Sequence, residues 1–390
     1  MGMSSPAPFR IAVEQEKLDY IHKRLADYRW FPAPSDDNWQ YGMKTSVLKE
    51  IVDYWLMDYD WRAAEDRLNQ YPHFIGNIDG LDVHFVHVVG EAEGKRPILI
   101  THGWPGSVFE FWDCIERLAY PSRFGGKPDD AFDLIIPSLP GYGWSAKPEK
   151  PLGQKATAAL WDQLMVTILG YDNYVAQGGD WGSVVTSWLG VQHGPGRGGC
   201  RAIHLNMIGL RPTSAMPQSD EEAKWQKDTK SKVVVEGAYL QQQATKPQSL
   251  AIGLMDSPMG QAAWILEKFH GWSDLGNDGD LLTTYSKDDL ITNLMIYLVN
   301  DAFATSVWYY AALFAEGGNS LPENTRCETP TAFANFKKEP LYSPPPRSWV
   351  ERVYNISRWS EYEQGGHFAA MEQPEKFCEE LEAWARELGD

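Results

Sequence analysis

The sequence predicts an α/β fold: a mostly parallel sheet with helices on both faces, an inserted helical lid and an N-terminal helical extension. From about residue 76 onward, short apolar runs that suit buried strands alternate with amphipathic stretches of helix length. This alternation stops between residues 207 and 315, where the pattern is helical, and resumes afterwards. We therefore divide the 390 residues into an extension (1–75), a first core part (76–206), a lid (207–315) and a second core part (316–390).

The extension is predicted to consist of amphipathic helices that pack on the rest of the molecule. Apolar residues recur at helical spacing from Leu18 to Leu25 and again from Val47 to Trp55. At the end of the extension the period changes, and Asp79-Gly80 marks a hairpin turn in front of the first core strands. We expect the extension to depend on the core for its stability.

The core strands are predicted from short apolar runs bounded by turns. Such runs suit strands that are buried on both faces, and helix-length stretches such as 157–169 supply the crossovers between parallel neighbours. A last amphipathic stretch, 374–388, closes the core. The predicted strands are 83–86, 97–101, 132–136, 174–177, 202–205, 331–336 and 356–361.

Charge and composition exclude several classes of protein. The formal net charge of −18 repels phosphate backbones and anionic lipid, which argues against nucleic-acid binding. No apolar run approaches the ~18 residues of a membrane span, and the N-terminus lacks a signal-peptide pattern, so we expect a soluble, cytoplasmic protein. The four cysteines lie far apart without metal-ligand spacing, and no phosphate-binding loop occurs. We therefore expect no metal and no organic cofactor.

The most informative segment is Gly178–Gly182 (GGDWG), which follows a predicted strand and precedes a helix predicted to begin near Ser183. Small residues around a central polar one are typical of a nucleophile elbow, a sharp strand-to-helix turn that exposes the nucleophile above the sheet. Here the central residue is Asp180, and the helix N-terminus favours its ionised form. The alternative is that Asp180 only caps the helix.

A second segment, His102–Ser107 (HGWPGS), directly follows the predicted strand 97–101. In hydrolases of this build, one oxyanion donor is a backbone N–H of such a loop, and the other is the N–H of the residue after the nucleophile. We therefore assign the oxyanion hole to the amides of Trp104 and Trp181, and expect both rings to line the substrate pocket. An ordinary turn rich in glycine and proline is the alternative.

A third segment, Gly365–Phe368 (GGHF), lies between the last predicted strand and the last predicted helix. The chain order nucleophile, acid, histidine requires a base about here, and none of the other histidines lies at the end of a late strand. We predict that His367 is the general base, although a lone histidine is more often structural.

With these motifs together, the chain resembles the epoxide hydrolases of the α/β-hydrolase superfamily, in particular the microsomal-type branch with its N-terminal extension. The resemblance implies an α/β-hydrolase core and a role in detoxification. The membrane anchor of the microsomal enzymes has no counterpart in this sequence, so we expect no membrane association. The matching segments are Phe9–Ile11, Tyr28–Trp30, Leu68–Asn69, Tyr71–Phe74, His102–Ser107, Gly178–Ser183, Asp256–Pro258 and Gly365–Glu372.

The resemblance also implies the acid of the catalytic triad. The family places it in a Phe-x-x-Glu pattern after the strand that precedes the histidine, and Phe336–Glu339 matches this pattern. Glu339 would then orient His367, unless it is one of the many surface glutamates. Asn206 occupies the other position where such enzymes sometimes keep an acid, and it cannot serve as one.

Two lid tyrosines that hold the epoxide oxygen are implied in the same way. Tyr239 and Tyr310 match them, although the related pattern around the second tyrosine usually carries two charged residues where this chain has Trp308 and Ala312. Whether Tyr310 or the neighbouring Tyr309 matches the second tyrosine of the family therefore stays open. Trp308 is expected to line a more apolar substrate pocket.

An aspartate at the elbow selects the reaction. An epoxide carbon is sp³, so an alkoxide nucleophile would leave a stable ether, whereas a carboxylate leaves an ester that water can hydrolyse. Asp180 would form this ester, His367 would activate the water, and a vicinal diol would leave. A haloalkane dehalogenase shares the nucleophile and base but needs halide donors in place of the tyrosines. A non-catalytic, lid-capped binding protein and an ester hydrolase are further alternatives.

The substrate is predicted only by class. The chain has 17 Trp, 18 Tyr and 15 Phe, and its lid holds Trp264, Phe269 and Trp272, which favours a bulky apolar or aryl epoxide, with water as the second substrate. The oligomeric state stays open, with a homodimer as one option.

Overall fold

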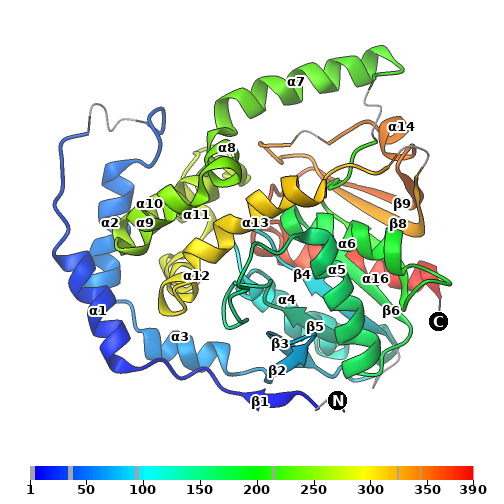
Figure 1. Ribbon diagram of the computed structural model, residues 1–390, viewed down its shortest axis with the longest axis horizontal. Helices are drawn as coiled ribbons and strands as arrows, with labels where there is room; N and C mark the ends of the chain where they lie inside the picture. The colour runs from blue at the N-terminus through cyan, green and yellow to red at the C-terminus, as the bar shows by residue number, and fades with distance from the viewer. Residues whose placement is uncertain are drawn as a thin grey trace.

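The computed structural model describes residues 5–33, 38–92, 96–212, 216–322, 325–342 and 344–389. These ranges form one nine-stranded sheet with the order β1-β2-β3-β5-β4-β6-β7-β8-β9 (Figure 1). The six strands from β5 to β9 pair in parallel, whereas β1, β2 and β3 are antiparallel, which confirms the predicted α/β fold. The strands are β1 Ala7–Phe9, β2 His73–Ile78, β3 Leu81–Val88, β4 Pro97–Thr101, β5 Asp133–Pro137, β6 Tyr174–Gly178, β7 Cys200–Leu205, β8 Cys327–Phe336 and β9 Tyr354–Tyr362.

Helices lie on both faces of this sheet. Figure 1 shows α5 (Gln154–Asp162) and α6 (Asp180–His193) in front of it, with α4 (Trp112–Ala119) and α16 (Pro374–Leu388) behind. The central strands β4, β5 and β6 are buried along their whole length, as their continuous apolar runs predict. The crossover predicted as one helix over 157–169 is instead α5 followed by a wider π-helical turn, Gln163–Ile168.

The lid is helical in the described part of 207–315, apart from a single β-bridge between Arg211 and Ser320. Its longest helix, α7, extends away from the body at the top of Figure 1, whereas α13 packs against α5, α8 and α9. The lid helices are α7 Asp220–Glu236, α8 Ala238–Thr245, α9 Pro247–Met255, α10 Pro258–Trp272, α11 Leu281–Thr284, α12 Lys287–Val299 and α13 Phe303–Glu316. Two short helices, α14 (Arg347–Val350) and α15 (Ala369–Glu372), lie in the second core part.

The extension links the lid to the sheet. Helices α1 (Gln15–Ala26), α2 (Thr45–Met57) and α3 (Trp61–Leu68) pack beside lid helices, and Arg67 of α3 pairs with Asp289 of α12 at 2.6 Å and with Asp113 of α4 at 3.0 Å. The helical prediction missed β1, which adds an antiparallel strand to the sheet edge. This strand is only three residues long, too short to show a hydrophobic period. It contains Pro8, which is tolerated because the strand lies at the edge of the sheet.

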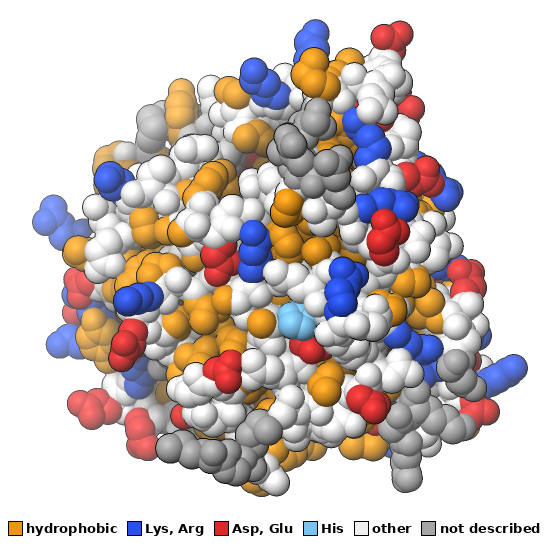
Figure 2. Space-filling model, turned by 45° about the vertical axis from the view of Figure 1, so that its right-hand side comes forward, with side chains coloured by type: hydrophobic (Ala, Val, Ile, Leu, Met, Phe, Trp, Pro, Cys, Tyr) orange, Lys and Arg blue, Asp and Glu red, His pale blue; other side chains and the backbone are white. Residues whose placement is uncertain are grey.

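The surface is mixed in charge. Figure 2 shows Lys and Arg side chains interspersed with Asp and Glu on the face in view, so the excess of negative charge does not gather there in one patch. Among the described helices, none alone combines the length and hydropathy of a membrane span. Helices α12 and α13 meet those criteria only as a pair, bent by 85° where they join.

Candidate active site

Asp180 lies at the tip of a tight turn between β6 and α6. Its φ of +45° falls in the left-handed region, which is unusual for a residue other than glycine and typical of a strained functional turn. The turn closes because its flanks have no side chains: a Cβ on Gly178 would lie 2.1 Å from the Gly182 carbonyl oxygen, and one on Gly182 would lie 1.9 Å from that of Thr101. Helix α6 begins at Asp180, three residues earlier than predicted, because the turn contains no separate loop.

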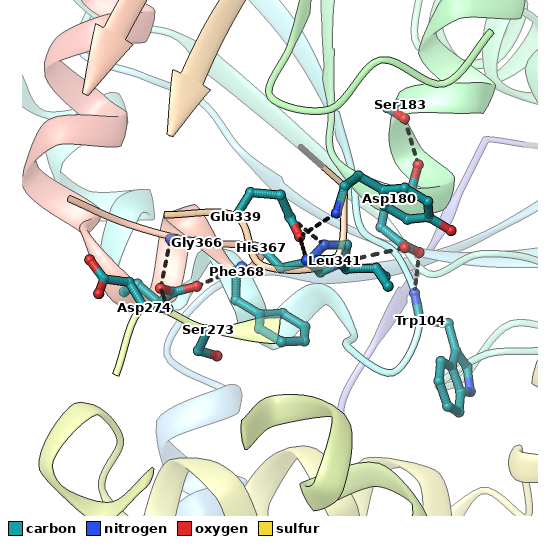
Figure 3. Close-up of polar contacts among 12 residues, drawn as sticks. Trp104, Asp180, Ser183, Ser273, Asp274, Glu339, Leu341, Gly366, His367 and Phe368 are labelled. Carbon is teal, nitrogen blue, oxygen red and sulfur yellow. Dashed lines mark hydrogen bonds and ion pairs between the residues drawn. The ribbon is translucent and has the colours of Figure 1, made fainter. Parts of the chain in front are cut away.

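The predicted oxyanion loop faces this carboxylate. The Trp104 amide donates to Asp180 Oδ1 at 2.8 Å (Figure 3). The amide of Trp181 belongs to the first turn of α6, where backbone N–H groups have no partner within the helix. Oδ1 therefore occupies the place where a negative oxygen would be stabilised, and Oδ2 is the atom left to react.

A buried histidine and the lid hold the oxyanion loop in place. His102 Nε2 accepts from the Leu139 amide at 3.1 Å and its Nδ1 lies 2.9 Å from the Gly103 carbonyl, while burial lowers the pKa of His102 to about 4. This histidine is thus neutral and structural. From helix α12, Asn293 donates to the Pro105 carbonyl at 2.8 Å and Tyr297 to the Gly106 carbonyl at 2.7 Å. The lid therefore braces the loop that carries Trp104.

His367 lies between two carboxylates. Its Nε2 is 3.2 Å from Asp180 Oδ2, and its Nδ1 is 2.7 Å from Glu339 Oε2 (Figure 3). Burial disfavours the imidazolium, but the charge of Glu339 and the contacts with Asp180 outweigh it and raise the pKa of His367 well above its usual range. His367 therefore holds a proton between the two acids.

Glu339 is held in position by its own backbone turn. It lies three residues beyond the end of β8, and its Oε1 accepts from the amides of Leu341 at 2.8 Å and Tyr342 at 3.2 Å. With one oxygen fixed in this way, the other is directed at His367. The structure therefore brings together Asp180, His367 and Glu339 from the ends of three different strand segments.

The loop that carries His367 is anchored by a second buried acid. Glu372 accepts from the amides of Gly366 at 2.7 Å and Phe368 at 2.8 Å, and also from that of Asp274, next to the end of α10, at 2.7 Å. Asp274 in turn accepts from the Gly365 amide at 3.0 Å. Burial raises the pKa of Glu372 to about 7. The position of the base thus depends on a lid-to-core network that no local motif revealed.

Tyr239 and Tyr310 face each other in the lid. Their ring centroids are 5.8 Å apart, both side chains are buried, and the Tyr310 hydroxyl has no hydrogen-bond partner among the described residues. Burial, together with the nearby charge of Asp180, raises the pKa of both hydroxyls well above the usual range, so both stay protonated. Tyr309 instead donates to Thr157 at 2.8 Å, on the side of the helix facing α5. The orientation thus favours Tyr310 over Tyr309 as the residue facing the site.

A cavity of about 500 Å³ lies between the lid and the core, with Asp180 at its base. Trp181, Tyr239 and Tyr310 are in its wall. The prediction for the Trp104 ring was wrong: it does not line this cavity, because it stacks behind Tyr239 with centroids 5.5 Å apart. Trp308 does not line this cavity: its indole lies 3.2 Å from Gln248 on the outside of α13, because it is two positions before Tyr310 on the helix. Other wall residues include Val184, Trp225, Val233, Leu240, Leu313, Phe314, Phe333, Phe336, Tyr342 and Trp349.

Two residues at the site were not predicted from the sequence. Tyr342 interacts with Tyr239, and burial raises its pKa to about 12, which adds a third protonated hydroxyl to the cavity wall. Glu110 is half-buried beneath the oxyanion loop. Both lie close in sequence to predicted site segments: Tyr342 follows Glu339 by three residues, and Glu110 follows the HGWPGS loop by three. Proximity in sequence does not indicate where either side chain points.

No group of three or more metal-ligating side chains occurs in the described part of the chain. The site therefore consists of a carboxylate, a histidine–glutamate pair, backbone amides and tyrosine hydroxyls. Fold and site together define an α/β-hydrolase whose nucleophile position carries an aspartate. A carboxylate at this position can act as a covalent nucleophile and form an ester with a substrate carbon.

Comparisons with known proteins identify the family. Residues 6–111 match the family model "Epoxide hydrolase N terminus", and residues 96–254 match that of the alpha/beta hydrolase fold. A relative from Stigmatella aurantiaca that carries an epoxide hydrolase name is 40% identical over 98% of this chain and 85% of its own. Epoxide hydrolase 1 of Oryctolagus cuniculus is 34% identical over 96% of this chain and 87% of its own. The chain belongs to the epoxide hydrolase family.

A solved structure agrees with this assignment. The juvenile hormone epoxide hydrolase of the silkworm Bombyx mori superposes with a TM-score of 0.86 at 30% identity, covering 100% of this chain and 96% of the other. The predicted resemblance, the α/β-hydrolase fold and the enzymatic activity are thereby confirmed. The chain is a hydrolase that acts on ether bonds, with an epoxide and water as its substrates.

Proposed function

We propose that Asp180 opens the epoxide ring by backside displacement. Its Oδ2 forms a bond to a ring carbon, the carbon–oxygen bond of the ring breaks, and Tyr239 or Tyr310 supplies a proton to the leaving oxygen. One observation carries this assignment: the Tyr310 hydroxyl is buried without a partner in the same cavity that has Asp180 at its base. A buried donor left unpaired is expected at a place where a substrate oxygen completes its hydrogen bond.

The second half of the reaction removes the ester. Once alkylated, Asp180 no longer carries the negative charge that helps to hold a proton on His367, so the pKa of the histidine falls. Its proton passes to the tyrosinate left by ring opening, and the neutral imidazole can then act as the general base. A water molecule then attacks the ester carbon, and negative charge develops on Oδ1. The amides of Trp104 and Trp181 stabilise this oxyanion, each by about 3 kcal/mol. Collapse releases the vicinal diol and restores the carboxylate.

The cavity supports a bulky apolar or aryl epoxide as the substrate. Its volume of about 500 Å³ suits a drug-sized molecule, and the aromatic and aliphatic side chains of its wall suit an apolar one, although Arg211, Lys230 and Asn335 also line it. Two relatives with this fold are named for juvenile hormone.

A small substrate panel tests this proposal. We expect vicinal diol from an aryl epoxide at a higher kcat/KM than from propylene oxide, and no bromide from 1-bromobutane. The aryl ring fills cavity volume that a three-carbon epoxide leaves empty, and each buried CH₂ contributes ~0.8 kcal/mol. Bromide release without diol would support a haloalkane dehalogenase, and preference for the small epoxide would contradict the substrate class.

The proposed proton donor has a matched control next to it in the chain. Tyr310→Phe should lower kcat/KM by about 10²-fold, the order of magnitude expected on removal of one donor that stabilises developing charge. Tyr309→Phe should leave kcat/KM within about threefold, because its hydroxyl bonds to Thr157 away from the cavity. Steady-state kinetics of the two variants show which tyrosine faces the substrate. Equal losses of kcat/KM in both variants would contradict the assignment of Tyr310.

We further propose a cytoplasmic location and no membrane or nucleic-acid partner. The four cysteines are buried free thiols, which agrees with a reducing compartment. A homodimer stays a prediction, and sedimentation of the purified chain tests it directly.

A further inference from the structure

Glu110 is a half-buried acid that the mechanism above does not use, and its Oε1 is fully buried. It lies in a 3₁₀ turn, Val108–Phe111, directly after the oxyanion loop, and its side chain folds back under that loop. A Cβ on Gly106 would lie 1.5 Å from Glu110 Oε1, so the carboxyl occupies the space that a side chain at residue 106 would need. Glycine at this position therefore admits the Glu110 carboxyl to the base of the active site.

The Glu110 carboxyl is incompletely hydrogen-bonded. Its Oε1 is buried without a partner among the described residues. Burial raises the pKa of Glu110 to about 8, and the negative charge of Asp180 adds to this rise, so the group is largely a neutral acid at pH 7. A neutral carboxyl can both donate and accept a hydrogen bond. An unpaired buried group of this kind usually bonds to an ordered water molecule.

A small cavity adjoins this unpaired oxygen. It has a volume of about 10 Å³, and its walls include Gly103, Glu110, Asp180, Asn206 and His367. This volume is about that of one water probe. A second polar atom of the wall, His367 Nε2, makes only the 3.2 Å ion pair with Asp180 Oδ2, which has no well-formed hydrogen bond and is lost once Asp180 is alkylated. The cavity thus has room for one water molecule and two polar groups that such a molecule would satisfy.

We propose that Glu110 is a positioning residue that holds the hydrolytic water between its carboxyl group, His367 Nε2 and the ester carbon of Asp180. This proposal rests on the two-step mechanism proposed above. The water gives one proton to His367 as its oxygen bonds to the carbonyl carbon of the ester, while the hydrogen bond to Glu110 fixes the direction of attack. Glu110 gains and loses no proton overall in this step.

A second small cavity lies next to Glu110. Glu110 also lines a pocket of about 40 Å³ on its other side, together with Arg67, Asp113, Tyr285 and Asp289. Glu110 does not line the large substrate cavity. The two small pockets therefore both border Glu110, on a part of the site that the alkyl group of the ester in the large cavity does not occupy.

The test separates the two half-reactions in the full-length enzyme. Glu110→Leu removes both hydrogen-bonding oxygens and should lower kcat about 10²-fold, as expected when a reactant loses its position. KM should fall by the same factor because the Asp180 ester accumulates, so kcat/KM and the stopped-flow rate of ester formation should not change. Glu110→Gln keeps a donor and an acceptor and should retain kcat within about fivefold. A role limited to stabilising the loop would lower kcat/KM instead.

Two further variants serve as controls, one for misfolding of Glu110→Leu and one for the effect of removing a glutamate charge elsewhere in the same region. If Glu110→Leu does not fold, Glu110→Asp, which withdraws the carboxyl by one methylene, should show the same parallel fall in kcat and KM. Glu116→Gln, an exposed change on the neighbouring helix α4, should change neither half-reaction. Unaltered kcat in folded Glu110→Leu, or slower ester formation, would overturn the role of Glu110. Absence of any ester or diol with the wild-type enzyme would instead overturn the proposed function.

Discussion

Asp180→Ala is expected to abolish diol formation. The side chain supplies the oxygen that forms the ester bond. The other described carboxylate of the large cavity, Glu339, has its oxygens bonded to His367 and to the amides of Leu341 and Tyr342. Loss of a covalent nucleophile typically lowers kcat by on the order of 10⁵- to 10⁶-fold. The measurement is diol release from an aryl epoxide, followed by chromatography over hours at high enzyme concentration.

The control for this variant is Asp172→Ala. Asp172 lies exposed on the loop before β6, in the same strand–turn–helix unit, so its removal should leave kcat within about twofold of the wild type. The melting temperature of Asp172→Ala should equal that of the wild type. That of Asp180→Ala should equal or exceed it, because the strained turn no longer holds a charge. Residual diol formation above one hundredth of the wild-type rate would assign the nucleophile to another residue.

His367→Gln is expected to stop the reaction at the ester. Ring opening needs the Asp180 carboxylate and the tyrosine donors, whereas hydrolysis needs a base next to the ester carbon, and only the second requirement depends on His367. We expect one equivalent of epoxide to be consumed per active site, with multiple turnover lowered by on the order of 10⁴-fold or more. Intact-protein mass spectrometry should show a mass increase equal to that of the epoxide.

Peptide mapping then locates the modified residue. The added mass should lie on the peptide that contains Asp180, and brief treatment with base should release it as diol. Glu339→Gln provides a graded comparison, because it keeps His367 but removes the charge that raises its pKa. It should slow hydrolysis without trapping the ester fully. Normal multiple turnover by His367→Gln would contradict the assignment of the base.

The parts of the site that were predictable are those set by local chain geometry. A carboxylate between small residues at the end of a buried strand has few structural alternatives, and the φ of +45° at Asp180 and the close approach of Gly182 to Thr101 are what the GGDWG spacing demands. The loop His102–Ser107 was predictable for the same reason, since it directly follows β4. Buried parallel strands were equally recognisable, because they are apolar along their whole length.

The parts that were not predictable depend on contacts between distant segments. Glu372 and Asp274 fix the His367 loop through backbone amides, and Tyr342 reaches Tyr239 across the cavity, yet nothing in the local sequence of these residues indicates their partners. The direction of the Trp308 side chain could not be predicted from the sequence either, since one helix face cannot be chosen from the continuous aromatic and apolar run 307–315. Side-chain direction in the lid is set by packing against the core.

Besides enclosing the substrate cavity, the lid holds the loop that carries Trp104. Helix α12 holds the carbonyls of Pro105 and Gly106, so the loop that supplies the Trp104 amide is fixed by the same segment that encloses the substrate. Helix α13 supplies Tyr310 at the opposite wall. Two neighbouring lid helices therefore position the Tyr310 hydroxyl and the loop of the Trp104 amide, which favours preorganisation of both proposed half-reactions.

The most direct test of a carboxylate nucleophile is a single turnover of the wild-type enzyme in H₂¹⁸O with enzyme in excess over an aryl epoxide. In the two-step mechanism, the oxygen added to the substrate comes from Asp180, so the first diol should contain no solvent ¹⁸O, and the label should appear in the peptide that contains Asp180. Diol that carries one ¹⁸O from the first turnover would show that water attacks the epoxide directly, and would contradict the covalent mechanism.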